Sequence, residues 1–261
     1  MARLCTLASG SKGNSTYIST CGGDILVDAG ISAKELLSSI DQIGDTTKLR
    51  AIAITHTHSD HTKGLKTFLN KTKIPIIASC DTLATLAETN LLPDGINTIV
   101  ADDKIITLGD IAIEFFKTSH DAKGSGGYVI NTPDQKRVAV CTDLGVMTDS
   151  VRQKLLGCNA VLIESNHDIE TLRRGPYPAS LKLRILSDEG HLSNNACAVE
   201  LPALLQRGAT RIVLGHLSTE NNSPMLARSA SNATLAQIGA KEGNDYILEI
   251  AKPKTIGVTV F

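Results

Sequence analysis

The feature of this chain that most restricts its fold is a cluster of imidazoles directly after an apolar segment. Residues 50–54 read RAIAI, the next residues read THTHSDH, and three of the seven histidines therefore fall at positions 56, 58 and 61. Side chains at the end of a buried strand are held rigidly and face an open loop, which suits metal ligands. A cluster that only faced water would have no packing reason to follow such a strand. The cluster predicts a fold in which further strands end at the same place.

Four more donor residues follow apolar, strand-like runs elsewhere in the chain. They are Asp28 after DILV, His120 after IAIEFFKTS, Asp143 after VAVCT and His216 after RIVLG. A single aspartate in such a position, as at Asp28, is usually a cap or turn residue. Imidazole and carboxylate together suit zinc, iron or manganese, and one short loop can begin two adjacent sites that later strand ends complete. We therefore expect a metal site.

Strand-like and helix-like segments alternate along the whole chain. Strands are expected at 3–8, 15–19, 24–30, 50–55, 74–79, 97–143 (several), 160–165, 211–216, 245–250 and 254–261. Helices are expected at 32–43, where Ser32 and Glu35 form a capping pattern, and at 81–90, 149–156, 178–188, 194–207 and 224–238. This order predicts an α/β fold with two sheets covered by helices. Without a repeat or a linker-like stretch, residues 1–261 are interpreted as a single domain.

Composition narrows the classes of function. The formal net charge is −1, so there is no overall basic field to attract nucleic acid, and polyanion binding would need a local patch. The six cysteines are scattered without a C-x-x-C pair, which favours buried free thiols in a reducing cytosol. The chain shows no signal-peptide pattern and no apolar run of membrane-spanning length. We expect a soluble, cytoplasmic protein with no membrane partner and no obligate protein partner that the sequence reveals.

The pattern His-x-His-x-Asp-His at 56–61, with the later donors and the upstream aspartate, resembles the metallo-β-lactamase superfamily. The resemblance implies a four-layer αββα sandwich, with two mixed sheets packed face to face, helices outside and two divalent metal ions at one edge. The implied ligands are His56, His58 and His120 for one ion, Asp60, His61 and His216 for the other, and Asp143 as a bridge. Asp28 would orient a histidine or the loop, as ligating imidazoles commonly require.

Other segments resemble the YycJ/WalJ group of bacterial proteins within that superfamily. They are SGSKGN (9–14), ESNHD (164–168), LRRGPYP (172–178), GHLSN (190–194) and LGHLSTENN (214–222). That group is similar to the nuclease branch with RNase Z and RNase J, and the resemblance implies a 5′-to-3′ exonuclease-like activity on DNA, with RNA as a further possible substrate. The short interval between Asp143 and His216 leaves no room for the β-CASP insertion of RNase J. No Gly/Pro-rich arm of the RNase Z kind is present.

A two-metal nuclease mechanism also requires a proton donor, and the remaining histidines are the candidates. Two ions roughly 3.5–4 Å apart clamp a phosphodiester and generate a hydroxide that attacks phosphorus in line. A nuclease must also protonate the leaving oxygen, and His191 and His167 are the candidate general acids. The position of His191 resembles that of the general-acid histidine of RNase Z, and Glu164 is expected to orient one of the two. Asp60 joins this catalytic set as a ligand. The alternatives are a helix-start residue at His191 and a surface or supporting residue at His167.

Substrate contacts have to come from local positive charge and polar loops. A basic segment ahead of the candidate acid contains Arg173, Arg174, Lys182 and Arg184, which either contact phosphates or form a solvated face. Ser11, Lys12 and Asn14 belong to SGSKGN, which either cradles a phosphate or is only a hairpin turn.

Three competing functions use the same metal motif. A thiolester hydrolase of the glyoxalase II type, a lactonase or a small phosphodiesterase would share the ligands. A thiolate leaves without protonation, so loss of His191 should impair a nuclease and spare a thiolesterase. A metal-stabilised binding protein without activity is the non-enzymatic alternative, although such relatives usually lose ligands and here every motif position is filled. Zinc, manganese and iron all remain open as the native ions.

Overall fold

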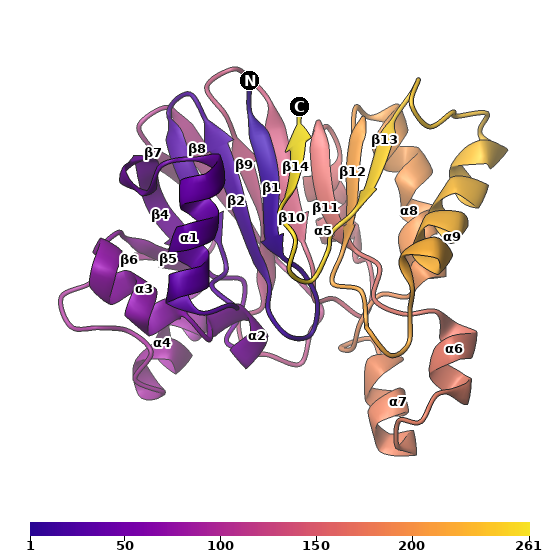
Figure 1. Ribbon diagram of the computed structural model, residues 1–261, viewed down its shortest axis with the longest axis horizontal. Helices are drawn as coiled ribbons and strands as arrows, with labels where there is room; N and C mark the ends of the chain where they lie inside the picture. The colour runs from indigo at the N-terminus through magenta and orange to yellow at the C-terminus, as the bar shows by residue number, and fades with distance from the viewer.

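Two seven-stranded mixed sheets pack face to face in the computed structural model, which describes residues 1–261 (Figure 1). The first sheet has the order β14-β1-β2-β3-β4-β5-β6 and the second has the order β13-β12-β11-β10-β9-β8-β7. The strands of the first sheet are β1 (Arg3–Ala8), β2 (Ser15–Thr20), β3 (Gly23–Val27), β4 (Leu49–Ala53), β5 (Ile76–Ala78), β6 (Thr98–Val100) and β14 (Gly257–Val260). Those of the second are β7 (Ile105–Leu108), β8 (Ile111–Lys117), β9 (Gly126–Asn131), β10 (Arg137–Cys141), β11 (Ala160–Glu164), β12 (Arg211–Gly215) and β13 (Ile247–Ile250).

The two sheets share one pairing plan. Strands β3 to β6 are parallel neighbours in the first sheet, and β10 to β13 are parallel neighbours in the second. The remaining pairs in each sheet are antiparallel. Every residue of β3 and β11 is buried, which is why these strands read as continuous apolar runs rather than alternating ones. The carboxyl ends of such strands carry the donor residues that the sequence singles out.

Helices cover the outer face of each sheet. The first sheet is covered by α1 (Ala33–Ile43), α3 (Leu65–Thr72) and α4 (Cys80–Glu88), and the second by α5 (Asp149–Leu155), α8 (Asn194–Gln206) and α9 (Pro224–Gln237). Three hydrophobic clusters fill the three interfaces, one beneath each helical layer and one between the sheets. The predicted four-layer αββα sandwich is confirmed. The capping pattern at the start of α1 is also present, since Ser32 and Glu35 exchange hydrogen bonds.

Three short helices lie at the edge where the donor residues gather. They are α2 (Ser59–Thr62), α6 (Ile169–Arg174) and α7 (Ala179–Ile185), and α6 and α7 extend beyond the sandwich (Figure 1). Helices α2, α3 and α6 are absent from the sequence prediction. No helix is both long and apolar enough to cross a bilayer. All six cysteines are free, as predicted, but Cys21 and Cys80 are exposed rather than buried.

Candidate metal centre

Strand ends from both sheets place the donor residues at one edge of the sandwich. His56 and His58 follow β4, Asp143 follows β10 and His216 follows β12. The backbone φ angles are 62° at Asp28, 61° at Asp143 and 54° at His216, a left-handed conformation that costs a non-glycine residue about 1–2 kcal/mol. Such strain persists where the surrounding structure fixes it, and here it turns the three side chains toward a common centre.

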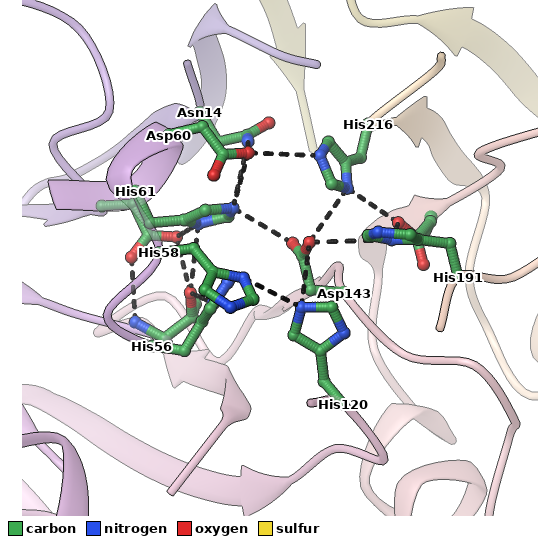
Figure 2. Close-up of polar contacts among 12 residues, drawn as sticks. Asn14, His56, His58, Asp60, His61, His120, Asp143, His191 and His216 are labelled. Carbon is green, nitrogen blue, oxygen red and sulfur yellow. Dashed lines mark hydrogen bonds and ion pairs between the residues drawn. The ribbon is translucent and has the colours of Figure 1, made fainter. Parts of the chain in front are cut away.

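The donor atoms form small groups that suit metal ions. Ligand atoms lie within 4.8 Å of one another in four sets, which are His56/His58/His120, His56/His61/Asp143, Asp143/Glu164/His191/His216 and Asp60/His61/His216. The first and last are the two ligand sets that the family resemblance implies, and Asp143 lies between them (Figure 2). Its Oδ2 is 3.2 Å from Nε2 of His61, and its Oδ1 is 3.8 Å from Nε2 of His120.

Two buried polar atoms at the middle of this arrangement have no hydrogen-bond partner. They are Nε2 of His56 and Oδ2 of Asp143, whose residues are 1% and 2% exposed. Leaving such atoms unpaired in the interior costs free energy unless something binds them. An imidazole lone pair and a carboxylate oxygen are ligands for divalent metal ions, so the residues present fit such ions.

The second ring nitrogen of each buried candidate ligand histidine is held by the protein. Nδ1 of His56 lies 3.0 Å from Oγ1 of Thr55, and Nδ1 of His120 lies 3.1 Å from the carbonyl oxygen of Gly190. A partner on one nitrogen fixes the tautomer and ring orientation, and leaves the other nitrogen free to ligate. The nitrogen left toward the centre is Nε2 in both rings, unpartnered in His56 and 3.3 Å from Nδ1 of His58 in His120.

Asp28 holds the second ring nitrogen of His61. Its Oδ2 lies 2.8 Å from Nδ1 of His61, while its Oδ1 accepts the backbone N–H of Thr55 at 2.9 Å and its Oδ2 accepts the Thr55 hydroxyl at 2.8 Å. One buried carboxylate therefore connects the end of β3 to both ends of the THTHSDH loop.

Glu164 holds one ring nitrogen of two histidines at the same time. Its Oε1 lies 2.7 Å from Nδ1 of His216 and 2.9 Å from Nδ1 of His191, and its Oε2 accepts the N–H groups of Leu144 and Leu192 at 3.2 and 3.0 Å. The side chain is fully buried at the end of β11. The sequence analysis paired Glu164 with a candidate acid but missed its contact with the ligand His216.

The charges of the site are strongly coupled. Burial alone lowers the pKa of His61, but the carboxylates of Asp143 and Asp28 outweigh burial and raise it to about 10. Burial raises the pKa of Glu164, but the neighbouring His191 and His216 outweigh burial and lower it to about 2. Burial lowers the pKa of His56 well below its usual value, so this ring is neutral at neutral pH. Metal binding at His61 therefore displaces a proton.

The loop of residues 9–14 is built into the site by its backbone. The N–H of Asn14 donates to the carbonyl of Asp60 at 2.7 Å, and the N–H of Gly30 donates to the carbonyl of Asn14 at 2.9 Å. A Cβ at Gly30 would lie 1.7 Å from the carbonyl oxygen of Asp60, so only glycine fits this approach. The side-chain nitrogen Nδ2 of Asn14 lies 3.2 Å from Oδ2 of Asp60 and 3.0 Å from Nε2 of His61. The structure thus places Asn14, predicted as a substrate contact, against the ligands.

A cleft of about 240 Å³ opens over the donor cluster. Ser11, Asp60 and His191 line it, together with Arg184 of the predicted basic segment and with Tyr177 and Leu181, which the sequence analysis did not assign to the site. Tyr177 and Leu181 reach the cleft because α7 and the residues before it border the metal centre, a relationship that no local pattern reveals.

Four predicted site residues neither line this cleft nor form a polar contact with the candidate ligands. Arg173 and Arg174 are exposed on α6 and form ion pairs with Glu170 at 3.2 and 3.5 Å. His167 is 1% exposed and neither of its ring nitrogens has a hydrogen-bond partner. Burial lowers the pKa of His167 to about 4, so the ring is neutral at neutral pH. Lys12 lines an adjoining groove instead.

Comparison with known proteins decides the family. A sequence profile described as "Beta-lactamase superfamily domain" matches residues 24–217. The chain belongs to the metallo-β-lactamase superfamily. Its relatives in that superfamily include exodeoxyribonuclease YycJ of Bacillus anthracis, which is 37% identical over 95% of this chain and 94% of its own length. Exodeoxyribonuclease WalJ of Streptococcus pneumoniae is 38% identical over 95% of this chain and 94% of its own length.

Solved structures agree on the metallo-β-lactamase fold. The metallo-β-lactamase fold protein YhfI of Bacillus subtilis superimposes with a TM-score of 0.69 over 99% of both chains at 18% identity. The predicted family and the resemblance to the YycJ/WalJ group are confirmed. The protein is accordingly an enzyme, a hydrolase of the metallo-β-lactamase fold whose His/Asp clusters suit divalent metal ions.

Proposed function

We propose that this protein is a two-metal phosphodiesterase that cleaves DNA as an exonuclease, with His191 as the proton donor to the leaving oxygen. The names of the relatives YycJ and WalJ support the substrate class. The single observation that carries the proposal is the His191–Glu164 contact of 2.9 Å beside the donor cluster. We assign one ion to His56, His58 and His120, the other to Asp60, His61 and His216, and the bridging position to Asp143.

The metal ions, when bound, supply Lewis acidity and neutralise the charge of the phosphodiester. The protein's own contribution begins with Glu164. Because Glu164 is ionised and accepts a hydrogen bond from Nδ1 of His191, the proton that can be transferred is the one on Nε2. The His191 side chain is 15% exposed and lines the cleft, so its free nitrogen is accessible to substrate.

This arrangement meets the chemical requirement of DNA hydrolysis. An oxygen from water forms a bond to phosphorus and the proton of that water passes to solvent. The bond from phosphorus to the leaving ester oxygen breaks, that oxygen takes the proton of His191, and His191 regains a proton from solvent. An alkoxide is a poor leaving group, so proton donation accelerates the step by about 10²–10⁴-fold. A thiolate needs no such proton. A donor that a buried carboxylate holds beside the donor cluster therefore favours a phosphodiesterase over a thiolesterase.

The test compares leaving groups. The purified protein with added Mn²⁺ or Zn²⁺ is assayed on end-labelled DNA, on an RNA strand of equal sequence, on bis-p-nitrophenyl phosphate and on a thiolester. We expect His191→Ala to lose DNA cleavage by about 10²-fold or more while retaining most activity on bis-p-nitrophenyl phosphate, whose leaving group needs little protonation. Asp60→Ala should lose both activities, and His167→Leu serves as the matched histidine control that loses neither. Absence of DNA cleavage by metal-loaded wild type would overturn the proposal, and a thiolester preference would replace it.

A further inference from the structure

A second hollow lies beside the cleft and continues it. This groove has a volume of about 800 Å³ and runs between the β1–β2 loop, α1, α2 and the segment that joins β13 to β14. Ser11 and Asp60 line both the groove and the cleft, so the two form one continuous depression with the metal centre at one end. Figure 1 shows the β1–β2 loop, α2 and the β13–β14 segment at the same edge of the sandwich.

The groove is positively charged, in contrast to the chain as a whole. Lys12, Lys63 and Lys254 line it, and all three are exposed. None of their ammonium groups forms a hydrogen bond or an ion pair, whereas Lys154 elsewhere pairs with a glutamate at 3.0 Å. Glu35 is the only carboxylate in the groove apart from Asp60, and it is engaged in the hydrogen bonds that cap α1. The Ser32 hydrogen bonds, together with the nearby Lys254 and Lys63, lower the pKa of Glu35, so its carboxylate stays ionised. Three separate segments thus bring three lysines to a surface that holds two carboxylates, which leaves a net charge of +1.

We propose that this groove holds the backbone phosphates of one DNA strand, next to the phosphodiester that lies at the metal centre. This inference rests on the proposed nuclease function and adds the path of the substrate to it. Lysine ammonium groups are point charges that bind phosphate without demanding one geometry, and the hydroxyls of Ser39 and Ser59 in the same walls donate to phosphate oxygens. Because no aromatic residue lines the groove, it offers no platform for base stacking and binds independently of sequence.

The opposite side of the cleft is a weaker candidate for this role. Its one lining arginine, Arg184, is already paired with Asp121, and the two arginines of α6, which lie outside the cleft, are paired with Glu170. Phosphate binding there would have to break existing ion pairs. Phosphate binding to the three groove lysines breaks no ion pair, so the structure favours the groove as the phosphate site.

The test removes the three groove charges and compares the result with an equal loss of charge elsewhere. The groove variant is Lys12→Ala/Lys63→Ala/Lys254→Ala. The matched control is Lys48→Ala/Lys71→Ala/Lys241→Ala, which alters exposed lysines outside the groove and the cleft. Both are assayed with wild type on a 20-nucleotide single-stranded DNA and on bis-p-nitrophenyl phosphate, across a series of NaCl concentrations.

We expect the groove variant to raise KM for DNA by about tenfold or more, and to make the slope of log(kcat/KM) against log[NaCl] shallower by about 2, since each single-strand phosphate contact contributes about 0.7. Its hydrolysis of bis-p-nitrophenyl phosphate should match wild type, which shows an intact metal centre. DNA cleavage with equal KM and equal salt slope in the groove and control variants overturns the groove assignment alone. Failure of wild type to cleave DNA while it hydrolyses bis-p-nitrophenyl phosphate overturns the groove together with the proposed function.

Discussion

Oε1 of Glu164 lies 2.9 Å from Nδ1 of His191. The same oxygen lies 2.7 Å from Nδ1 of His216, so one buried atom orients both the proposed proton donor and a metal ligand. A change at this position therefore acts on metal affinity and on proton donation together.

Glu164→Gln tests this dual role. The amide keeps the shape of the side chain, but its NH₂ group must take the place of one carboxylate oxygen. It then faces either the N–H donors of Leu144 and Leu192 or the two imidazoles that the carboxylate held. We expect metal affinity to fall about 10–100-fold, as is typical when the partner of a ligating histidine is lost. Titration against a competing chelator measures the affinity, and Glu200→Gln, whose native carboxylate pairs with Arg152, is the control. Unchanged affinity in both variants contradicts the assignment.

Asp28→Asn tests the support of the other half of the centre. Asparagine tolerates the left-handed backbone at this position, so the effect comes from the lost charge rather than from strain. The carboxylate contacts His61 and both the N–H and the hydroxyl of Thr55. We expect metal bound per protein at limiting metal to fall well below the wild-type value, as measured by elemental analysis after gel filtration. Wild-type metal content together with wild-type stability would show that Asp28 only shapes the loop.

Metal removal should lower the thermal stability, because the ligands come from both sheets and ions bind only to the folded chain. An ion present at 100 times its Kd stabilises the folded state by about 2.7 kcal/mol. For a chain of this size that corresponds to a Tm increase of roughly 5–10 °C. Differential scanning calorimetry with and without EDTA measures the shift. His56→Ala, which removes a donor common to two of the clusters, should show a smaller shift, and an equal shift would argue against His56 as a ligand.

Acid sensitivity should depend in part on His167. Burial lowers its pKa to about 4 in the folded state, while the unfolded chain takes up a proton near the ordinary value of about 6.5. Protons therefore bind preferentially to the unfolded state between these values, and the free energy of unfolding falls as pH drops from 6.5 toward 4, by up to about 3 kcal/mol from this residue.

His167→Leu tests the predicted contribution of His167 to acid sensitivity. It removes two buried nitrogens that lack hydrogen-bond partners, so we expect stability at pH 7.5 equal to or above that of wild type. Urea unfolding of both proteins in EDTA, at pH 7.5 and pH 5, gives the comparison, since the other histidines titrate alike in each. Parallel pH dependence of the two proteins would contradict the assignment.

The sequence predicted the parts of the site that depend on strand ends. His56, Asp143 and His216 each follow a buried apolar strand, and such strands deliver their ends to one edge of a sandwich, so the clustering could be anticipated. The layered fold followed from the same alternation of elements. These features are encoded locally, in hydrophobic runs and the residues that end them.

Contacts between distant segments could not be predicted in this way. The carbonyl of Gly190 holds His120 across 70 positions of sequence, and Lys254 reaches the groove from the far end of the chain. Arg173 and Arg174 illustrate the opposite case, because they lie near His191 in sequence yet a short helix turns them toward solvent. Closeness in sequence does not determine which way a side chain points, because that orientation depends on how the segments pack.

The division of the donor residues between the two sheets also determines when the centre can form. During synthesis, the imidazoles that follow β4 leave the ribosome long before Asp143 and His216 have been added. A nascent chain that ends before β10 carries an incomplete donor set, and an ion that it captured would lack the ligands that retain it. Because the first sheet is completed only by the C-terminal strand β14, we expect stable loading with metal to be a late event in biogenesis that follows the docking of the two sheets.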